Sequence, residues 1–231
     1  GCWFTEGHGE LSLNEAMAVS CDVYFYKTVT QLNLQNLHDT FKQFGFGSKT
    51  NIDVPNEANG LIPDKDYMTK RYGKYGWSRG VLLNLAIGQG ELLVTPIQIL
   101  NYINLLSTKG VSPSNHFVFV DNLPLNVKPN LSSEIWDIIH NGLRSAIISS
   151  AGTGKKSDPQ VEGFVVYGKT GTAENSHGDN HAWFVGWADY KQKKYSIAIL
   201  LENAGSGGAI AAPFARKIFD KIISKNSYAS R

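Results

Sequence analysis

The sequence has few cysteines and no long hydrophobic run. Only Cys2 and Cys21 occur among its 231 residues, and two cysteines neither make a disulfide framework nor fix the redox compartment. No stretch of 18 apolar residues is present, so we expect no segment to span a bilayer. The chain also opens without an initiator Met or a signal peptide. We therefore interpret it as a fragment or a trimmed chain.

The sequence also has no large excess of positive or negative charge. The 22 Lys and Arg residues nearly balance the 20 Asp and Glu residues, and the net charge is +2. The basic residues are scattered and form no stripe, which argues against nucleic acid as a partner. A hydrophobic content of 42% is ordinary for a globular protein. The length suits one large domain, or one and a half small ones.

The first two thirds of the chain predict helices joined by loops. Ser12 and Glu15 fit a capping box, in which each side chain bonds the other's backbone amide. Thr95 followed by Pro96 is a strong helix start. We expect helices over residues 13–20, 23–32, 34–44 and 96–108, and one that begins after Ser132 or Ser133. In that last helix the apolar residues 135, 138, 139, 143, 146 and 147 predict one buried stripe. Residues 46–80 are rich in Gly, Asn, Asp and Pro and predict an extended surface excursion.

The last third changes to the pattern of β-strands. Residues 163–167, 181–188 and 195–201 are rich in β-branched and aromatic residues, and a polar turn at 190–194 predicts a hairpin between the last two. Pro213 then opens a helix in which we expect residues 214, 218, 219, 222 and 223 to face one side. The fold class is therefore α/β in the α+β sense, with a helical layer, an antiparallel sheet and a closing helix.

The segment Lys169-Thr170-Gly171-Thr172 carries the clearest chemistry. Its ammonium and hydroxyl groups can hold a carboxylate through charge-assisted hydrogen bonds, and Gly171 lets a ligand backbone approach closely. Lys-Thr-Gly on a strand is a motif of penicillin-binding proteins and serine β-lactamases. The tripeptide alone is weak, because an exposed strand edge gives the same letters by chance.

The same region also fits the phosphate-loop pattern, with Gly163 and Gly168 at its two glycine positions. That pattern would indicate an ATPase or a GTPase. A phosphate loop must wrap a phosphate and then start a helix. The four residues between the glycines favour a strand, and the glycines and Asn after Thr170 start no helix, so we reject this alternative.

Two smaller patterns have simple structural explanations. Ser20-Cys21-Asp22 lies where two helices meet, and Asp22 alone reads best as an N-cap of the second helix. His177 and His181 are four residues apart, but they lie in a Gly-rich loop. Zinc needs three or four ligands, and no third ligand is evident there, so we expect no metal site.

Taken together, these segments resemble the transpeptidase domain of a class B penicillin-binding protein of the penicillin-binding protein 2 (elongation) type. Residues 20–26 resemble the family's second motif, which often ends in Asp in elongation enzymes. Residues 86–90 and 95–98 resemble the segment between the motifs, residues 7–9 the lead-in to the helix, and residues 183–187 the strand after Lys-Thr-Gly. The resemblance implies one partial transpeptidase domain over 1–231. Residues 1–160 would be mainly helical, and residues 161–231 would form the sheet strands and the C-terminal helix.

The resemblance also assigns roles. Ser20 would relay a proton and Asp22 would position the donor peptide. Lys169, Thr170 and Thr172 would bind the terminal carboxylate of a D-Ala-D-Ala stem peptide, and the Thr172 amide would form half of an oxyanion hole. The family's nucleophile lies in a Ser-x-x-Lys motif, and no Ser in this chain has Lys three residues later. The nucleophile would therefore lie before Gly1, and we expect the chain alone to be inactive.

Further expectations concern partners and location. The resemblance implies peptidoglycan stem peptides and β-lactams as ligands, no cofactor, and a polytopic glycan polymerase of the cell-elongation machinery as partner. The domain would face the periplasm, anchored in the cytoplasmic membrane by a helix outside this chain. The sheet would lack strands, so strand 195–201 would have an exposed edge and the chain could self-associate. A β-lactamase or β-lactam sensor of the same fold and a non-catalytic scaffold stay as alternatives.

Overall fold

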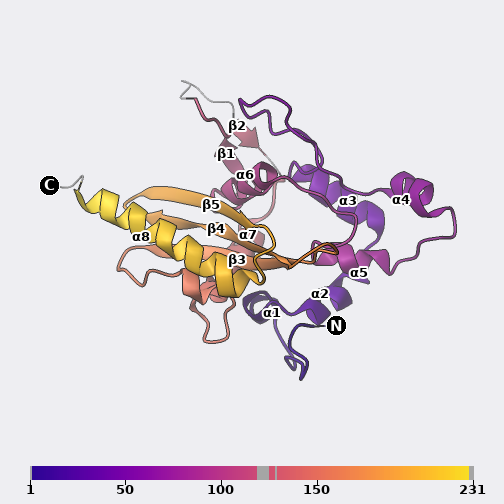
Figure 1. Ribbon diagram of the computed structural model, residues 1–231, viewed down its shortest axis with the longest axis horizontal. Helices are drawn as coiled ribbons and strands as arrows, with labels where there is room; N and C mark the ends of the chain where they lie inside the picture. The colour runs from indigo at the N-terminus through magenta and orange to yellow at the C-terminus, as the bar shows by residue number, and fades with distance from the viewer. Residues whose placement is uncertain (1, 119–124, 128, 229–231) are drawn as a thin grey trace. The chain divides into compact units, whose positions relative to one another are not determined.

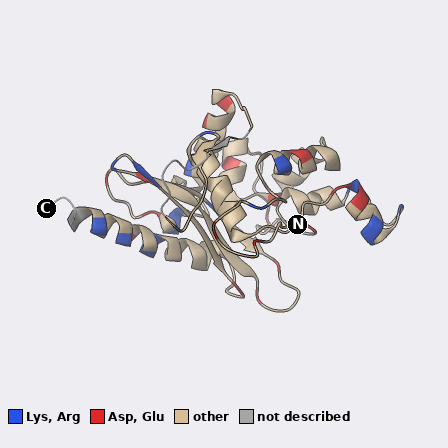
Figure 2. Ribbon diagram, turned by 90° about the horizontal axis from the view of Figure 1, so that it is seen from above, with Lys and Arg blue, Asp and Glu red and all other residues tan. Residues whose placement is uncertain are grey.

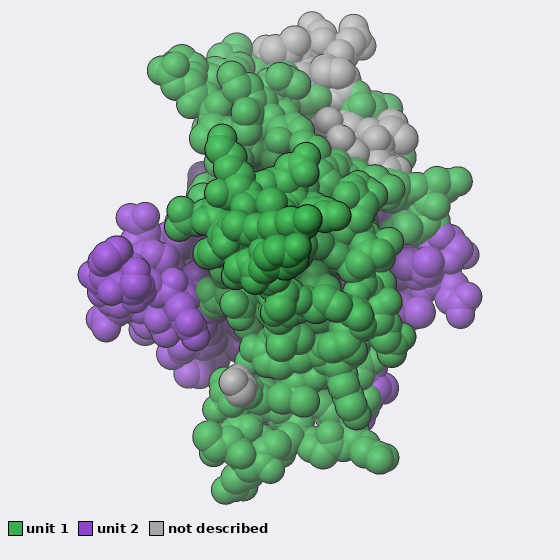
Figure 3. All heavy atoms as spheres, turned by 90° about the vertical axis from the view of Figure 1, so that its right-hand side faces the viewer, with its two compact units in different colours: residues 1–11, 21–131 green, residues 12–20, 132–231 purple. Residues whose placement is uncertain are grey.

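The computed structural model describes residues 2–118, 125–127 and 129–228. The chain divides into two compact units, which Figure 3 shows in different colours. Unit 1 contains residues 1–11 and 21–131, and unit 2 contains residues 12–20 and 132–231. Unit 2 is thus built from two stretches that lie far apart in the sequence.

The centre of unit 2 is an antiparallel sheet of three strands in the order β3-β4-β5. The strands are β3 (Val165–Ala173), β4 (His181–Tyr190) and β5 (Lys193–Leu201). Lys191 and Gln192 join β4 to β5 with φ angles of 47° and 62°. Two successive positive φ angles are typical of the tight hairpin turns that match strand twist, so the predicted hairpin is confirmed. Among the described residues, β5 pairs only with β4 and forms one edge of the sheet.

Helix α8 (Ala212–Tyr228) covers one face of this sheet (Figure 1). It follows a short π-helical turn, η2 (Gly207–Ala211). Phe219 is fully buried and packs on Phe164 with ring centroids 5.4 Å apart. Phe214, expected on the buried side, is 44% exposed. Ala212 and Ala215 lie in the core instead, because small side chains let the helix approach the sheet closely.

The opposite face of the sheet meets α7 (Ser133–Ile148), whose His140 ring lies 5.0 Å from that of Trp187. Ser132 caps α7, as predicted. The predicted stripe is partly wrong, because Ile135 and Ile138 are exposed while Trp136 is buried. Helix α1 (Leu13–Val19) packs on α7, and its predicted capping box is present. The short 3-10 turn η1 (Lys155–Ser157) follows α7.

Unit 1 is mainly helical and begins its helices where the sequence has capping residues. Its helices are α2 (Asp22–Val29), α3 (Leu34–Gln43), α4 (Lys65–Tyr72), α5 (Val81–Ala86) and α6 (Pro96–Ser107), and its strands are β1 (Val111–Pro113) and β2 (Leu125–Val127). Thr95 and Gln98 make a reciprocal cap on α6, with Pro96 at the first position. Gln98 is buried, and its side-chain amide donates to two loop carbonyls, which ties the excursion to α6.

The prediction of an extended excursion over residues 46–80 is wrong where α4 forms. Asp64 caps α4 by accepting from the Tyr67 amide at 2.7 Å, and Met68 is 1% exposed in a core shared with Leu85. That burial stabilises a turn of helix that composition alone does not favour. The strands β1 and β2 and helix α5 were not predicted.

Charged residues lie on the outer sides of the elements in both units. Figure 2 shows several Lys and Arg residues along α8, and one acidic residue of that helix, Asp220, forms an ion pair with Arg216. Within the described part of the chain, no helix is both long and apolar enough to cross a bilayer.

Candidate active site

Lys169 and Ser20 are brought together in unit 2, as the two motifs that contain them lead one to expect. The Lys169 ammonium donates to Ser20 Oγ at 2.8 Å and to the Thr170 carbonyl at 2.9 Å. Both groups are half-buried. Successive residues of β3 point to opposite faces of the sheet. Lys169 lies on the same face as Tyr167, and α7 packs on that face. The pair therefore places a cation beside a hydroxyl that can pass a proton.

The conformation of Ser20 comes from the way α1 ends. Ser20 is the C-cap of α1, in the left-handed region at φ 55° and ψ 55°. Its amide donates back to the carbonyls of Ala16 and Met17, which satisfies groups that a helix end leaves open. A non-glycine residue in this region carries a strain of about 1 kcal/mol or more, and strain of this kind gathers at functional turns.

Thr170 points away from Lys169, into the packed side of the sheet. It is 9% exposed, and its hydroxyl donates to the hydroxyl of Thr153 at 2.8 Å. Thr153 is held by its own amide, which donates to the Ala18 carbonyl of α1 at 3.1 Å. The loop after α7 thus links the Lys-Thr-Gly strand to α1. The contact depends on the path of this loop, so it was not predicted.

Thr172 and Gly171 lie where β3 passes the start of η2. Thr172 is exposed, and its hydroxyl accepts from the Gly207 amide at 3.2 Å. A Cβ on Gly207 would lie 2.3 Å from the Gly171 carbonyl and 2.4 Å from the Trp183 carbonyl. Only glycine fits there without moving the backbone, so the turn before α8 closes directly on the strand that carries the motif.

The phosphate-loop alternative has no support from the backbone. Gly163 precedes β3, and the strand then continues through Gly168 and Thr170 to Ala173. Gly168 faces Gly186 across the sheet, and a Cβ there would lie 2.6 Å from the Phe184 ring. The glycine allows close packing of the strand on its neighbours and wraps no anion.

Asp22 lies in unit 1 as the first residue of α2. The N-cap is Cys21, not Asp22, so the simple capping explanation for Asp22 is wrong. A carboxylate in the first turn of a helix is nevertheless favourable, because the helix dipole is positive there. Asp22 follows Ser20 by two residues, across the junction between the two units.

One group of three side chains that could hold a metal ion was missed in the sequence. Cys2, His8 and Cys21 are close enough that their ligand atoms all lie within 4.8 Å of one another, the one such group of three found in the described residues. Sulfur and imidazole nitrogen are donors that Zn²⁺ favours. His181, considered earlier, instead accepts from the Asn203 amide at 3.0 Å. The irregular spacing of 6 and 13 residues gave no signal in the sequence.

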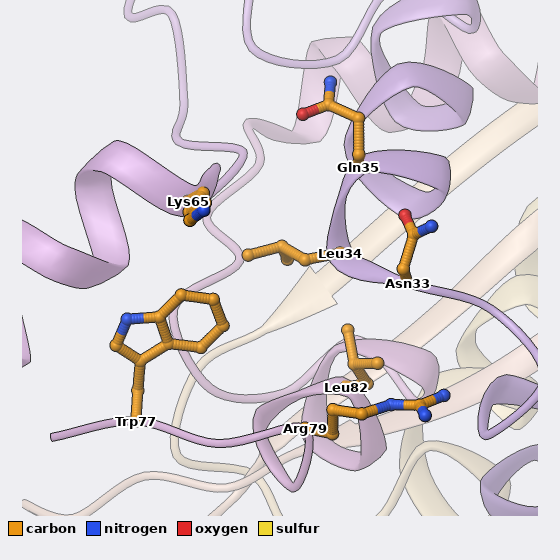
Figure 4. A pocket seen from close by; sticks show the side chains of 7 residues that line it. All are labelled: Asn33, Leu34, Gln35, Lys65, Trp77, Arg79 and Leu82. Atoms are coloured by element: carbon orange, nitrogen blue, oxygen red, sulfur yellow. The ribbon is translucent and has the colours of Figure 1, made fainter. Parts of the chain in front are cut away.

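Unit 1 also has a shallow pocket of about 300 Å³ that contains none of the motif residues (Figure 4). Leu34, Leu82 and Trp77 give it apolar walls, and Lys65 and Arg79 lie at its margin. The Arg79 guanidinium already donates to the Thr30 and Leu32 carbonyls. Its charge therefore holds the end of α2 in place.

The comparison with known protein families agrees with the fold and with the motifs. A family model described as the penicillin binding protein transpeptidase domain matches residues 1–220. The chain therefore belongs to the family of penicillin-binding protein transpeptidase domains.

Within that family, the chain is similar to penicillin-binding protein 2. It is 30% identical to the peptidoglycan D,D-transpeptidase MrdA of Haemophilus influenzae, over 96% of this chain and 38% of that protein. Penicillin-binding protein 2 of Helicobacter pylori, solved in complex with MreC, matches with a TM-score of 0.82 and 33% identity over 95% of this chain and 42% of that one. The Pseudomonas aeruginosa protein, solved with WCK 5153, gives 0.81 and 31%, over 95% and 49%. These matches confirm the predicted fold class, and the chain spans less than half the length of each.

Proposed function

We propose that the protein is a peptidoglycan D,D-transpeptidase that cross-links D-Ala-D-Ala stem peptides through an acyl-enzyme. The observation that carries the proposal is the 2.8 Å hydrogen bond from Lys169 to Ser20. It joins the Lys-Thr-Gly strand to the Ser-x-Asp turn across 149 residues of sequence. Relatives named peptidoglycan D,D-transpeptidase MrdA support the same activity.

The chemistry starts with a serine nucleophile, which the family carries in its Ser-x-x-Lys motif. That serine attacks the D-Ala-D-Ala amide, the terminal D-Ala leaves, and an amine of a second stem peptide takes the acyl group. Ser20 relays the proton to the leaving nitrogen, with Lys169 holding its hydroxyl in place. Asp22 positions the donor peptide from the start of α2.

The substrate carboxylate binds to the Lys169 ammonium and the Thr172 hydroxyl, which is exposed at the end of β3. Thr170 joins them only when its hydroxyl turns away from Thr153. The Thr172 amide forms half of the oxyanion hole, and losing such a donor raises the barrier by about 3 kcal/mol. Gly171 leaves room for the ligand backbone.

The relatives support the proposed partners and location. One relative was solved with MreC and another is described as part of a peptidoglycan synthase complex, so the protein works with a glycan polymerase and the elongation machinery. It faces the periplasm and is anchored in the cytoplasmic membrane. Residues 1–231 form one partial transpeptidase domain, inactive without the Ser-x-x-Lys segment. β-Lactams bind as mimics of D-Ala-D-Ala.

A labelled penicillin tests this proposal on a protein that includes the family's Ser-x-x-Lys segment. We expect one covalent label per molecule, and a fall in the acylation rate of about 100-fold or more for Lys169→Ala. Lys155→Ala is the matched control, because Lys155 is an exposed lysine of the same unit whose ammonium donates to the Ser150 carbonyl. Undiminished labelling of Lys169→Ala would refute the role of Lys169.

The alternatives give other results in the same assay. A β-lactamase would release the label by rapid hydrolysis, and a scaffold would take up none. The chain of 231 residues alone is expected to take up no label. A labelled band from it would mean that the nucleophile lies within these residues.

A further inference from the structure

Two loops of unit 2 are joined to each other beside the end of β3. Residues 174–180 connect β3 to β4, and residues 202–206 connect β5 to η2. The side-chain amide of Asn175, in the first loop, donates to Asn203 Oδ1, in the second, at 2.7 Å. The Asn180 carbonyl accepts from the two backbone amides that follow Asn203, at 3.0 and 2.9 Å. These hydrogen bonds hold the loops together, and we call them the loop pair.

Asn203 is the residue through which most of these contacts pass. Its φ angle is 51°, in the left-handed region that asparagine tolerates better than most other non-glycine residues. Its own amide donates to Nδ1 of His181, the first residue of β4, at 3.0 Å. A Cβ on Gly178 would lie 2.9 Å from Asn203 Oδ1, so a glycine there lets the first loop approach closely. Because Asn203 is exposed, hydrogen bonds rather than core packing define its position.

The loop pair adjoins the hydroxyl that binds carboxylate in the proposed reaction. Thr172 lies one residue before the end of β3, so the first loop begins almost directly after it. The second loop leads into Gly207, whose amide donates to the Thr172 hydroxyl oxygen at 3.2 Å. Both loops are therefore connected to Thr172, one through the chain and one through a hydrogen bond. A shift of either loop would move this hydroxyl.

We propose that Asn203 is a positioning residue that gives the enzyme its preference for ligands with a free carboxylate. Asn203 holds the two loops together, and the loops hold the Thr172 hydroxyl where it meets the carboxylate beside Lys169. A donor that is already in place costs no ordering when the ligand binds. This inference rests on the proposed function, because it concerns the same carboxylate site.

The effect should be confined to the carboxylate, because the proton relay is held by other contacts. The Lys169 ammonium donates to Ser20 Oγ and to the Thr170 carbonyl, and these three residues lie outside the loop pair. Loosening the loops should therefore weaken the binding of the carboxylate and leave the relay intact. A residue that merely stabilised the fold would change the reaction of all ligands alike.

Penicillin and its methyl ester separate these two cases, on a protein that includes the family's Ser-x-x-Lys segment. Asn203→Gly removes the side-chain amide and still allows the left-handed backbone. We expect its acylation rate to fall about five-fold with penicillin, as for the loss of one hydrogen bond. The rate with the ester, which offers no charge to the site, should change less than about two-fold. Equal falls with both ligands, or no fall with either, would overturn the inference.

A second variant tests whether Asn203 acts through its partner in the other loop. Asn175→Ala removes the donor of the same hydrogen bond, so it should lower the penicillin rate by a similar factor. The double variant should fall no further, because the bond is already lost. Factors that multiply in the double variant would contradict the pairing. Asn141→Ala, at an exposed asparagine of α7 in the same unit, is the matched control and should leave both rates unchanged.

The same measurements distinguish this inference from the proposed function. An unchanged protein that takes up no label from either ligand would sink the transpeptidase, and the role of Asn203 with it. An unchanged protein that is labelled, with the same preference for penicillin over its ester in Asn203→Gly, would sink the role of Asn203 alone. Denaturant unfolding checks that the variants are folded, and we expect midpoints close to that of the unchanged protein because Asn203 is exposed.

Discussion

The Lys169 ammonium lies 2.8 Å from the Ser20 hydroxyl, and both residues belong to the same compact unit. A cation at this distance donates to the hydroxyl oxygen and holds it in place. The pair thus has the geometry that the relay in the proposed reaction needs.

Replacing Ser20 tests that relay. Ser20→Ala removes the hydroxyl while keeping a small side chain in the α1 C-cap, and the acylation rate with penicillin is expected to fall about 100-fold. The rate is measured under single-turnover conditions on protein that contains the nucleophile. Ser150→Ala, at an exposed serine of the same unit, serves as the control. A Ser20→Ala protein that acylates at the normal rate would exclude the relay.

The Thr153 and Thr170 hydroxyls form a second pair open to measurement. Thr153→Val keeps the shape but leaves the Thr170 hydroxyl without its partner, so we expect a loss of about 1 kcal/mol in the free energy of unfolding. In a double-mutant cycle with Thr170→Val, the two losses should not add, and the coupling should be about 1 kcal/mol. Strict additivity of the two losses would show that the hydrogen bond contributes nothing.

The unpaired edge of β5 predicts that copies of the chain associate with one another. The backbone groups on its outer side have no strand partner among the described residues, and such edges pair with other chains. We expect the 231-residue chain to form dimers or larger species at micromolar concentration in sedimentation velocity. Ser196→Lys, which puts a charge on that edge away from the face covered by α8, should shift the distribution toward monomer. A monodisperse monomer of the unchanged chain would contradict the prediction.

Tyr102 predicts a loss of stability at alkaline pH. Burial raises the pKa of Tyr102 to about 12, and its ring lies 5.2 Å from that of Phe44 in an edge-on contact. An unfolded chain releases the phenol proton near pH 10. The unfolded state therefore binds fewer protons between about pH 10 and 12, and the free energy of unfolding falls as the pH rises through this window.

Denaturant titrations at several alkaline pH values measure that slope. Tyr102→Phe should flatten it, because the side chain at position 102 then has no proton to release. Tyr75→Phe, at a ring that is 88% exposed, should leave the slope as it is. The same slope in the protein and in Tyr102→Phe would assign the alkaline loss to other groups.

Much of the fold could be predicted from local signals in the sequence. The caps at Ser12, Thr95 and Ser132 depend on side chains within three residues of the helix start, so the sequence alone places them. The tight turn at 191–192 follows from its polar residues in the same way. The buried side of each helix was harder to predict, because it depends on the neighbouring element. Trp136 is buried where Ile135 was expected, and Ile135 is exposed.

The candidate site also has one part that the sequence predicts and one part that it does not. Lys169 and Ser20 were expected to face one cleft because both lie in motifs with a fixed chemistry. The contact of Thr170 with Thr153 and the grouping of Cys2, His8 and Cys21 depend on loop paths that no periodic pattern encodes. They became visible only when the chain was folded.

The split composition of unit 2 also bears on how the protein reaches its native state. Residues 12–20 are synthesised early, but the sheet and helices they pack on follow more than a hundred residues later. Contacts this distant in sequence form slowly, because the chain between them must first be brought together. During synthesis α1 must therefore wait, without its packing partners, until β3 has left the ribosome. A chaperone that shields short amphipathic segments would find its target there.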